Sequence, residues 1–343
     1  MGWVPHGLRP RAANVPAVGH TFMKRHLSRL FRIALVAGCL TYALWGVDLA
    51  GLVRALAAFR PLPVGLYALM VLGVTILPGV RLRFLMQGAI PTLTGIWACL
   101  IGLALNNVLP ARLGEMAKAL YLRREGGTSL GKSLEAVFWE RFFDLNALLA
   151  LGVAVAALLG QGVVLYPLLA LVGGVWCVLV LLRLRPGAAF ALLRLLPVEK
   201  LRLFATEMLE LLQANLRLGF FLRLAGLTVA VWLAYMALYA VGLGFMAGLG
   251  FDPVMVLTVF AVATLGFAMP GAPGGMGVYE ASMVLALGWF GVDRDRAFAV
   301  ALAMHLLQYV PVTVIGLWRL GASGMTLRDL RAEAGRPAAS PAA

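Results

Sequence analysis

The feature that most constrains this chain is a run of twenty residues, 61–80, without a charged side chain. A helix of about 20 apolar residues is long enough to cross the hydrocarbon core of a bilayer. Only 13% of the residues are charged, about half the share of a soluble domain. The sequence therefore predicts an all-α polytopic membrane protein with six full transmembrane helices, over residues 33–53, 61–80, 136–159, 163–182, 224–250 and 297–318.

Two further regions, 84–122 and 253–291, do not fit an uninterrupted span. In the first, Asn106 and Asn107 stand shortly before Pro110, and charged residues follow. In the second, Pro270 begins a glycine-rich stretch that ends shortly before Glu280. Proline lacks a backbone N–H and clashes with the preceding turn, so helix must end there. Irregular backbone at membrane depth is tolerated only where protein or a water-filled cavity satisfies it. We therefore predict two re-entrant hairpins.

The distribution of basic residues predicts the orientation. With a cytoplasmic N-terminus, four of the 29 Lys and Arg fall outside (Arg54, Arg60, Arg294 and Arg296) and three are embedded (Arg112, Lys118 and Arg141), while the rest lie on the cytoplasmic side. Short cytoplasmic loops carry such an excess of basic residues. We expect a multi-pass protein of the cytoplasmic (inner) membrane with both termini in the cytoplasm. The first hairpin then enters from the cytoplasm and the second from outside.

The remaining segments predict simple roles. Residues 1–30 are basic and lack the long apolar region of a signal peptide, so we expect a disordered cytoplasmic tail, and translation can start at Met1 or Met23. Residues 31–320 form the single transmembrane domain, and 321–343 a second disordered tail. The stretch 187–222 mixes leucines with charges, which fits either an amphipathic interfacial segment or a solvated connector packed on the protein.

The two hairpin regions resemble each other. Each continues into a long span, and Glu115 precedes Arg141 by 26 residues while Glu280 precedes His305 by 25. The predicted orientations of the two units are opposite. An inverted-topology repeat with paired Pro/Gly-interrupted segments is the architecture of many secondary transporters, and it points to a binding site near the midplane.

Ionisable residues within the spans are the candidate site residues, because charge in hydrocarbon is costly. Glu115 lies three residues from both Arg112 and Lys118, so all three share a helix face. Asp144 lies three residues from Arg141 and four from Glu140, so it shares a helix face with both. Either these groups form internal ion pairs that lock helices together, or they bind a substrate; the sequence leaves both open.

Several other polar residues allow two interpretations. Glu280 can favour a helix N-terminus, or it can meet a cation or bind a proton. His305 is either a hydrogen-bonded core residue or, because it matches Arg141, a functional one. Asn106 and Asn107 can cap broken helices or line a cavity. The glycines Gly274, Gly275 and Gly277 resemble a phosphate loop in composition but lack its Lys-Ser/Thr, so a tight turn explains them too.

Other functions find little support. Cys39, Cys99 and Cys177 stand apart, and no Cys/His spacing of a metal site is present. We find no Ser-His-Asp set or HExxH motif, so we expect no enzyme, no cofactor and no metal. The net charge of +14 lies in short loops rather than on a soluble face, which argues against nucleic-acid binding.

Three motifs in order resemble the lysylphosphatidylglycerol synthase transmembrane-region family, whose members are flippase-like: Asn107-x-x-Pro110-x-Arg112-x-Gly114-Glu115, Glu140-Arg141-x-x-Asp144, and Pro273-Gly274-Gly275-x-Gly277-x-Tyr279-Glu280. The resemblance covers nearly all of residues 30–320 and implies lipid translocation between leaflets. It departs from the family in two ways. No soluble aminoacyl-transferring domain follows, so lipid aminoacylation is not expected, and arginine is usual where this chain has His305.

The sequence thus predicts a translocator for a phospholipid or a lipid-linked head group. Arg112 and Arg141 would attract a phosphate, while Glu115 and Glu280 would face a cationic group or a proton. The alternative is an accessory subunit of a cell-envelope lipid or glycolipid synthase without transport of its own. The expected partners are membrane lipids with an anionic or lipid-linked head group, a lipid synthase, and a second copy of the chain in a homodimer.

Overall fold

The computed structural model describes residues 37–109, 113–185, 217–269 and 273–325, together with single positions at 34, 187, 191, 199, 202, 206 and 210. Over these residues every regular element is a helix. The predicted tail 1–30 lies outside the described residues, as do residues 326–343 of the predicted tail 321–343 and most of the predicted amphipathic segment 187–222. Arg112 also lies outside the described residues. Residues 321 and 322, which we predicted to belong to the second tail, are instead the last two of the helix Arg294–Ala322.

Four described helices are long and apolar enough to cross a membrane: Pro61–Leu85, Leu130–Leu158, Leu218–Met246 and Arg294–Ala322. The last three have 29 residues each, a length of about 43 Å at 1.5 Å per residue. A fifth span results if the bent pair Ala37–Leu44 and Leu49–Ala57 counts as one. The helix α8 (Gly162–Leu184), with 23 residues, follows α7 (Leu130–Leu158) as predicted. The chain therefore has the helix lengths of a multi-pass membrane protein.

The predicted uninterrupted span over residues 33–53 is wrong. The helix Ala37–Leu44 and α2 (Leu49–Ala57) meet at 79°. Gly46 adopts a left-handed backbone conformation that ends the first helix. The Asp48 carboxylate then accepts hydrogen bonds from the N–H groups of Ala50 and Gly51, so it caps the start of α2. A residue expected near the end of one span instead begins a new helix.

Two halves of the molecule share one order of elements. The first half consists of α3 (Pro61–Gly73) with α4 (Ile76–Leu85), then α5 (Thr92–Val108), α6 (Gly114–Gly126) and α7 (Leu130–Leu158). The second half consists of α11 (Leu218–Ala240) with the π-helix η2 (Val241–Met246), then α12 (Pro253–Ala268), the short η3 (Pro273–Gly275), α13 (Val278–Gly288) and α14 (Arg294–Ala322). Each half is a long helix, a broken hairpin and a second long helix.

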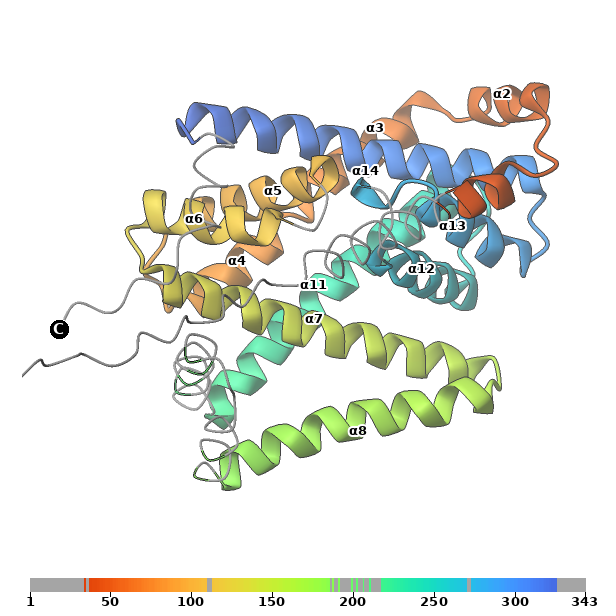
Figure 1. Cartoon of the computed structure of the whole chain (residues 1–343). Helices are drawn as coiled ribbons and strands as arrows, with labels where there is room; N and C mark the ends of the chain where they lie inside the picture. The colour runs from red at the N-terminus through yellow and green to blue at the C-terminus, as the bar shows by residue number, and fades with distance from the viewer. Residues whose placement is uncertain are drawn as a thin grey trace, which may run out of the picture.

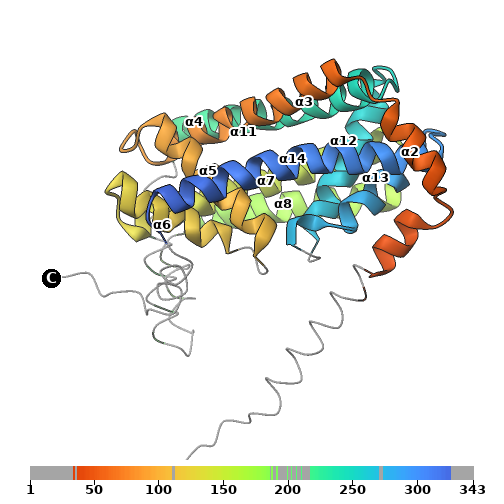
Figure 2. The same ribbon diagram turned by 90° about the horizontal axis from the view of Figure 1, so that it is seen from above.

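The two broken hairpins lie toward opposite ends of the molecule, with their breaks toward its middle (Figures 1 and 2). Helix ends at both places where the sequence predicts it, at Val108 and at Ala268. The α5 and α12 helices have 17 and 16 residues, which is shorter than the about 20 needed for a full crossing.

One glycine in each hairpin allows its two helices to approach closely. A Cβ atom at Gly102 of α5 would lie 3.2 Å from the carbonyl oxygen of Gly114, the first residue of α6. A Cβ atom at Gly266 of α12 would lie 3.3 Å from the carbonyl oxygen of Val278, the first residue of α13. Small residues permit such contacts between membrane helices. In both hairpins, a glycine on the first helix therefore lets the second helix begin close beside it.

Buried apolar side chains form two clusters, one for each half. One lies mainly among α11 to α14 and includes Val259, Met283 and Met304. The other lies among α4 to α7 and includes Leu82 and Trp139. The α5 helix packs along α14 and joins the halves, because Gly316 of α14 lies against the backbone of α5.

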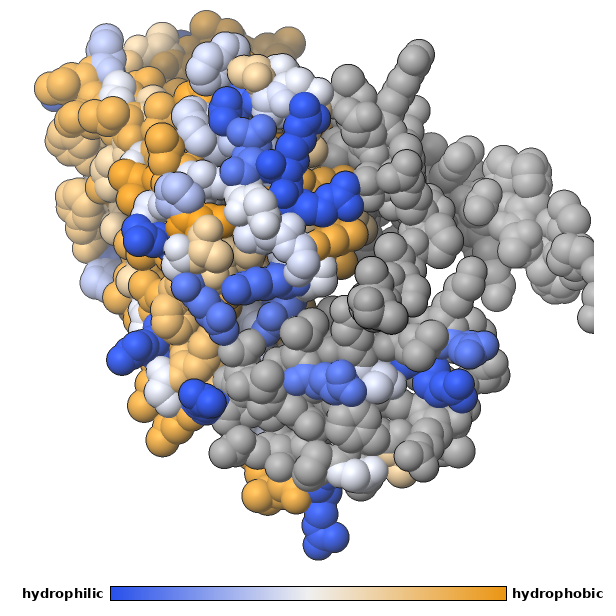
Figure 3. All heavy atoms as spheres, turned by 90° about the vertical axis from the view of Figure 1, so that its left-hand side faces the viewer, coloured by the Kyte–Doolittle hydropathy of each residue, from blue (hydrophilic) through white to orange (hydrophobic). Residues whose placement is uncertain are grey.

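Hydrophilic side chains gather at the end of the molecule where α6 and the last turns of α14 lie, and hydrophobic ones flank them (Figure 3). Exposed charged residues at this end include Arg83, Arg123, Arg124 and Glu125. The Arg124 guanidinium donates to the carbonyl of Gly324 at 3.2 Å, which ties α6 to the end of α14.

Candidate functional site

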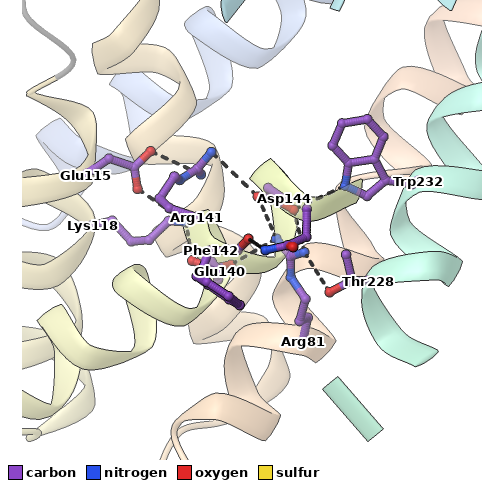
Figure 4. Close-up of polar contacts among 10 residues, drawn as sticks. Arg81, Glu115, Lys118, Glu140, Arg141, Phe142, Asp144, Thr228 and Trp232 are labelled. Carbon is purple, nitrogen blue, oxygen red and sulfur yellow. Dashed lines mark hydrogen bonds and ion pairs between the residues drawn. The ribbon is translucent and has the colours of Figure 1, made fainter. Parts of the chain in front are cut away.

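A buried network of ion pairs connects α4, α6 and α7 (Figure 4). The Arg81 guanidinium binds both oxygens of Asp144, at 2.6 and 3.1 Å, and its Nη2 lies 3.6 Å from Glu140 Oε1. The Lys118 ammonium lies 2.8 Å from Glu140 Oε2. The side chains of Arg81 and Glu140 are only 3% and 1% exposed, so these contacts replace hydration and hold the helices in register.

Arg81 is the main site residue that the sequence analysis missed. The sequence analysis counted it among the cytoplasmic residues and not among the embedded ones, because it follows a charge-free run, but the structure buries it. The helix continues to Leu85, which places Arg81 one turn inside the span. Its signal in the sequence is weak, since an arginine that closes a span and one just inside it look alike.

Arg141 is the accessible cation of this network. Its guanidinium lies 3.1 Å from Glu115 Oε1 and 3.6 Å from Asp144 Oδ2, and its side chain is 51% exposed. Among the described residues, three cations (Arg81, Lys118, Arg141) face three carboxylates (Glu115, Glu140, Asp144), so the formal charges of these six cancel.

Both carboxylates that bind Arg141 also have other donors. Glu115 accepts a hydrogen bond from the Asn106 amide at 3.4 Å, and the Lys118 ammonium lies 4.0 Å away. Asp144 is held by Arg81 and by the Trp232 indole N–H, at 3.2 Å. Arg141 can therefore turn to another anion without leaving either carboxylate unpaired.

The neighbours Asn106 and Asn107, in the last turn of α5, make different contacts. The Asn106 side-chain oxygen accepts from the N–H of Gly114 at 2.9 Å, a capping contact at the start of α6. The Asn107 amide donates to the Thr313 hydroxyl of α14 at 2.8 Å. Asn106 thus belongs to the charged network, and Asn107 to the contact with the second half.

A second polar cluster lies at the break of the other hairpin. The Nδ1 atom of His305 is 2.6 Å from Glu280 Oε1, and its Nε2 atom is 3.0 Å from the carbonyl oxygen of Gly274. The other oxygen of Glu280 accepts from the N–H of Gly277 at 2.7 Å. The side chains of His305 and Glu280 are both 8% exposed. The carboxylate therefore both caps α13 and pairs with α14.

Tyrosines surround this second cluster. The Tyr279 ring lies 4.5 Å from the His305 ring, centre to centre. The Tyr279 hydroxyl accepts a hydrogen bond from the Tyr239 hydroxyl at 3.1 Å, and Gln308 donates to the Tyr67 hydroxyl at 2.8 Å. These contacts bring α3 and α11 to the site.

Close packing explains the glycines of the break. Gly274 and Gly275 have φ of 67° and 74°, which glycine adopts readily. A Cβ atom at Gly274 would lie 2.3 Å from the Tyr309 ring, and one at Gly275 would lie 2.8 Å from the Phe267 ring. The turn therefore needs glycine for both its backbone and its neighbours.

The breaks of the two hairpins touch each other. The Tyr309 hydroxyl donates to the carbonyl of Asn107 at 3.1 Å, and a Cβ atom at Gly274 would lie 3.5 Å from the same carbonyl oxygen. The structure thus gathers the described candidate residues into two clusters that adjoin at Asn107: Asn106, Glu115, Glu140, Arg141 and Asp144 in one, and Gly274, Gly275, Gly277, Tyr279, Glu280 and His305 in the other.

Comparison with known proteins now decides the family. The sequence profile described as the lysylphosphatidylglycerol synthase TM region matches residues 29–316. The chain belongs to this family. Among the curated relatives of this family member are two UPF0104 membrane proteins. One, from Methanocaldococcus jannaschii, is 25% identical over 62% of this chain and 91% of its own length. The other, from Methanothermobacter thermautotrophicus, is 28% identical over 63% of this chain and 70% of its own length.

Every candidate residue lies within the segment that matches the lysylphosphatidylglycerol synthase TM region. The resemblance drawn from the three sequence motifs is therefore confirmed. Within the described part of this family member, no group of three or more His, Cys, Asp and Glu side chains could hold a metal ion.

Proposed function

We propose that this protein moves a phospholipid or a lipid-linked head group between the leaflets of the cytoplasmic membrane. The observation that supports this most directly is the contact between two broken hairpins, with a half-exposed arginine in the charged network beside it. A continuous apolar bundle needs neither feature. Broken helices with charged groups near the middle are the arrangement in which transporters bind substrate.

The proposed membrane placement follows from the two halves. Each hairpin is too short to cross and is followed by a long helix, and the two lie toward opposite ends of the molecule (Figure 2). We place the end with Arg83, Arg123 and Arg124 in the cytoplasm, because basic residues gather there. The α5–α6 hairpin then enters from the cytoplasm, and the α12–α13 hairpin enters from outside.

Arg141 is the proposed contact for the phosphate of the head group. A guanidinium binds phosphate through two parallel hydrogen bonds and stays charged at all relevant pH values. When a phosphate replaces the two carboxylates as the partner of Arg141, Glu115 keeps Lys118 and Asn106 as donors. Asp144 keeps Arg81 and Trp232. Binding an anion therefore exchanges contacts without exposing a buried charge. The sequence adds Arg112, at the same break, as a second cation.

A transport assay tests this proposal. Purified protein is reconstituted into vesicles with a fluorescent head-group lipid, and the fraction of label open to a membrane-impermeant quencher is followed over time. We expect wild type to equilibrate the lipid and Arg141→Gln to be slower by at least about tenfold, because one charge-assisted contact is worth about 1.5–3 kcal/mol.

The matched control is Arg54→Gln, which removes an arginine whose side chain is 79% exposed on α2. It should transport like wild type. Equal rates in empty vesicles, wild type and Arg141→Gln would refute the proposal. Cysteine labelling at positions 107 and 275, in a background without the native cysteines, tests the placement, since both should be shielded from bulky aqueous reagents.

A further inference from the structure

The environment of the His305 ring fixes how many protons the second cluster holds. Its two nitrogens face a carboxylate oxygen of Glu280 and the carbonyl oxygen of Gly274, at 2.6 and 3.0 Å. A carbonyl and an ionised carboxylate only accept hydrogen bonds, and a neutral imidazole donates from only one nitrogen. A neutral ring beside an ionised Glu280 therefore cannot make both contacts.

One more proton satisfies every contact. Either the imidazolium donates to both acceptors, or a neutral ring donates from Nε2 to Gly274 while a protonated Glu280 donates to Nδ1. In both cases the pair carries no net charge, and the second Glu280 oxygen still accepts from Gly277. The arrangement in the structure is thus the proton-loaded form of the pair.

Loss of that proton has a specific structural consequence. The carboxylate is the stronger acceptor, so the remaining ring proton stays on Nδ1, and Nε2 then presents a lone pair to the Gly274 carbonyl. The hydrogen bond from His305 of α14 to the Gly274 carbonyl is lost, and the pair retains one negative charge on side chains that are 8% exposed. A buried carboxylate without a positive counter-charge is costly even when it accepts hydrogen bonds, which favours opening of the break toward water.

Among the residues that the structure describes, no other group around the ring supplies a second cation. The described side chains facing His305 are Tyr279 of α13, Tyr309 of α14 and Phe267 of α12. Tyr239 of α11 reaches the cluster through the Tyr279 hydroxyl. Residues 270–272, which precede η3, are Pro, Gly and Ala and have no titratable side chain. The net charge of the described part of the site therefore depends on Glu280 and His305.

We propose that the His305–Glu280 pair is a proton-binding site that couples lipid movement to proton movement. Proton binding latches the break of the α12–α13 hairpin to α14, and proton release unlatches it. This inference rests on the proposed function, because the coupled motion is that of the lipid pathway. The ligand is H⁺, and its direction of flow relative to the lipid sets the energy source of transport.

Glu280→Gln is the diagnostic variant. A glutamine oxygen can accept from Gly277 while its amide donates to Nδ1, and a neutral His305 then donates from Nε2 to Gly274. Every contact is satisfied without an ionisable partner. The latch should stay closed at all pH values, and proton dependence should disappear. His26→Gln, which changes a histidine in the N-terminal segment, is the matched control.

The first measurement is independent of transport. Histidine-selective nitrogen NMR of the protein in nanodiscs is recorded from about pH 5 to about pH 9, the range in which imidazoles titrate. The signal missing from His305→Gln identifies His305. In wild type we expect one pH-dependent change at His305, either the loss of a ring proton or a switch of the ring proton from Nε2 to Nδ1, and in Glu280→Gln a neutral ring throughout. A wild-type His305 signal that never changes in this range would overturn the proton site.

The second measurement is lipid movement under a pH gradient. The rate of a step that moves one proton changes by up to about tenfold per pH unit. Reversing a one-unit gradient should therefore change the wild-type rate several-fold. His26→Gln should respond alike, and Glu280→Gln should not respond. Wild-type transport that ignores the gradient would overturn the coupling and leave the proposed function standing. No lipid movement under any condition would refute the proposed function and the coupling, and the NMR result would still decide whether the pair binds a proton.

Discussion

The two halves of the molecule place a carboxylate–cation pair at the same position but build it differently. In each, the carboxylate lies in the first turn of the second hairpin helix and its partner lies in the following 29-residue helix. Glu115 and Arg141 are 3.1 Å apart, and the arginine is 51% exposed. Glu280 and His305 are 2.6 Å apart, and both side chains are 8% exposed.

The difference suggests that the two pairs have different roles. Arginine keeps its charge at any physiological pH, and here its partners have other donors, so the first pair suits reversible binding of an anion. Histidine changes its charge in this range, and both of its nitrogens are engaged, so the second pair suits a latch that responds to protonation. Under the two proposals above, the same scaffold position would serve as an open ligand contact in one half and as a closed switch in the other.

The prediction with the largest expected effect tests whether the charged network of α4, α6 and α7 depends on the buried Arg81. Arg81→Ala leaves Asp144 and Glu140 without their shared cation, and removing one partner of a buried pair costs about 3–5 kcal/mol. We expect a loss of that size in the free energy of unfolding, measured by thermal or denaturant unfolding in detergent.

Arg83→Ala is the control for Arg81→Ala. Arg83 lies two residues away, is exposed, and donates to the Thr92 hydroxyl at 3.1 Å. Its loss should cost under about 1 kcal/mol, as for other surface contacts. Equal losses in the two variants would mean that the network contributes nothing beyond ordinary surface interactions.

The second prediction tests how closely the break of the α12–α13 hairpin is packed. Gly274→Ala places a methyl group 2.3 Å from the Tyr309 ring at a φ of 67°, so steric overlap adds about 1–3 kcal/mol to about 1–2 kcal/mol of backbone strain. Gly160→Ala separates the two terms, because Gly160 has a φ of 66° with nothing within 4 Å of the added methyl. If both variants lose the same stability in thermal unfolding, the break is less closely packed than the structure indicates.

Much of this arrangement could be predicted from the sequence. Apolar runs of sufficient length predict helices, and Pro110 and Pro270 predict where two of them are interrupted. The spacing from Glu115 to Arg141 and from Glu280 to His305 predicts matching positions in the two halves. Both pairs are indeed in contact. These features are local or depend on one repeated interval, so they can be recognised in the sequence alone.

The rest depends on contacts between distant segments. Arg81 and Asp144 are 63 residues apart, and nothing near either residue in the sequence identifies the other as its partner. The contact of Gly274 with Asn107 and Tyr309 depends on how the two hairpins meet. The bend after Leu44 was missed because Asp48 caps a helix there instead of ending a span. Hydropathy alone does not register such a cap.

The third prediction converts the first pair into a titratable one. In Arg141→His the cation is present below the ordinary imidazole pKa of about 6.5 and is lost above it. The rate of lipid movement relative to wild type, measured without a gradient at each pH, should therefore fall by up to about tenfold per pH unit as pH rises through this value. Arg141→Lys keeps its charge and should show a pH-independent ratio. A flat ratio for Arg141→His would show that the charge at position 141 does not act on the substrate.

The smallest expected effect compares how the two hairpins cap their second helices. The α13 helix is capped from within, by Glu280 on the N–H of Gly277, whereas α6 is capped from across the break, by Asn106 on the N–H of Gly114. Asn106→Ala should cost about 1 kcal/mol, the usual value for a lost cap, measured as a lower unfolding temperature.

Asn106→Asp separates the cap from the second contact of Asn106. A carboxylate still accepts from Gly114, so the cap should return, and the lost stability should be regained less the repulsion between the new charge and Glu115. The amide that donates to Glu115 at 3.4 Å is replaced by a second negative charge, which holds Arg141 more strongly and should slow lipid movement. Restored stability with slower transport would show that Asn106 acts on the arginine through Glu115. If Asn106→Asp matches wild type in both measurements, Asn106 only caps α6, and the hairpins differ in how they are built but not in how they work at this position.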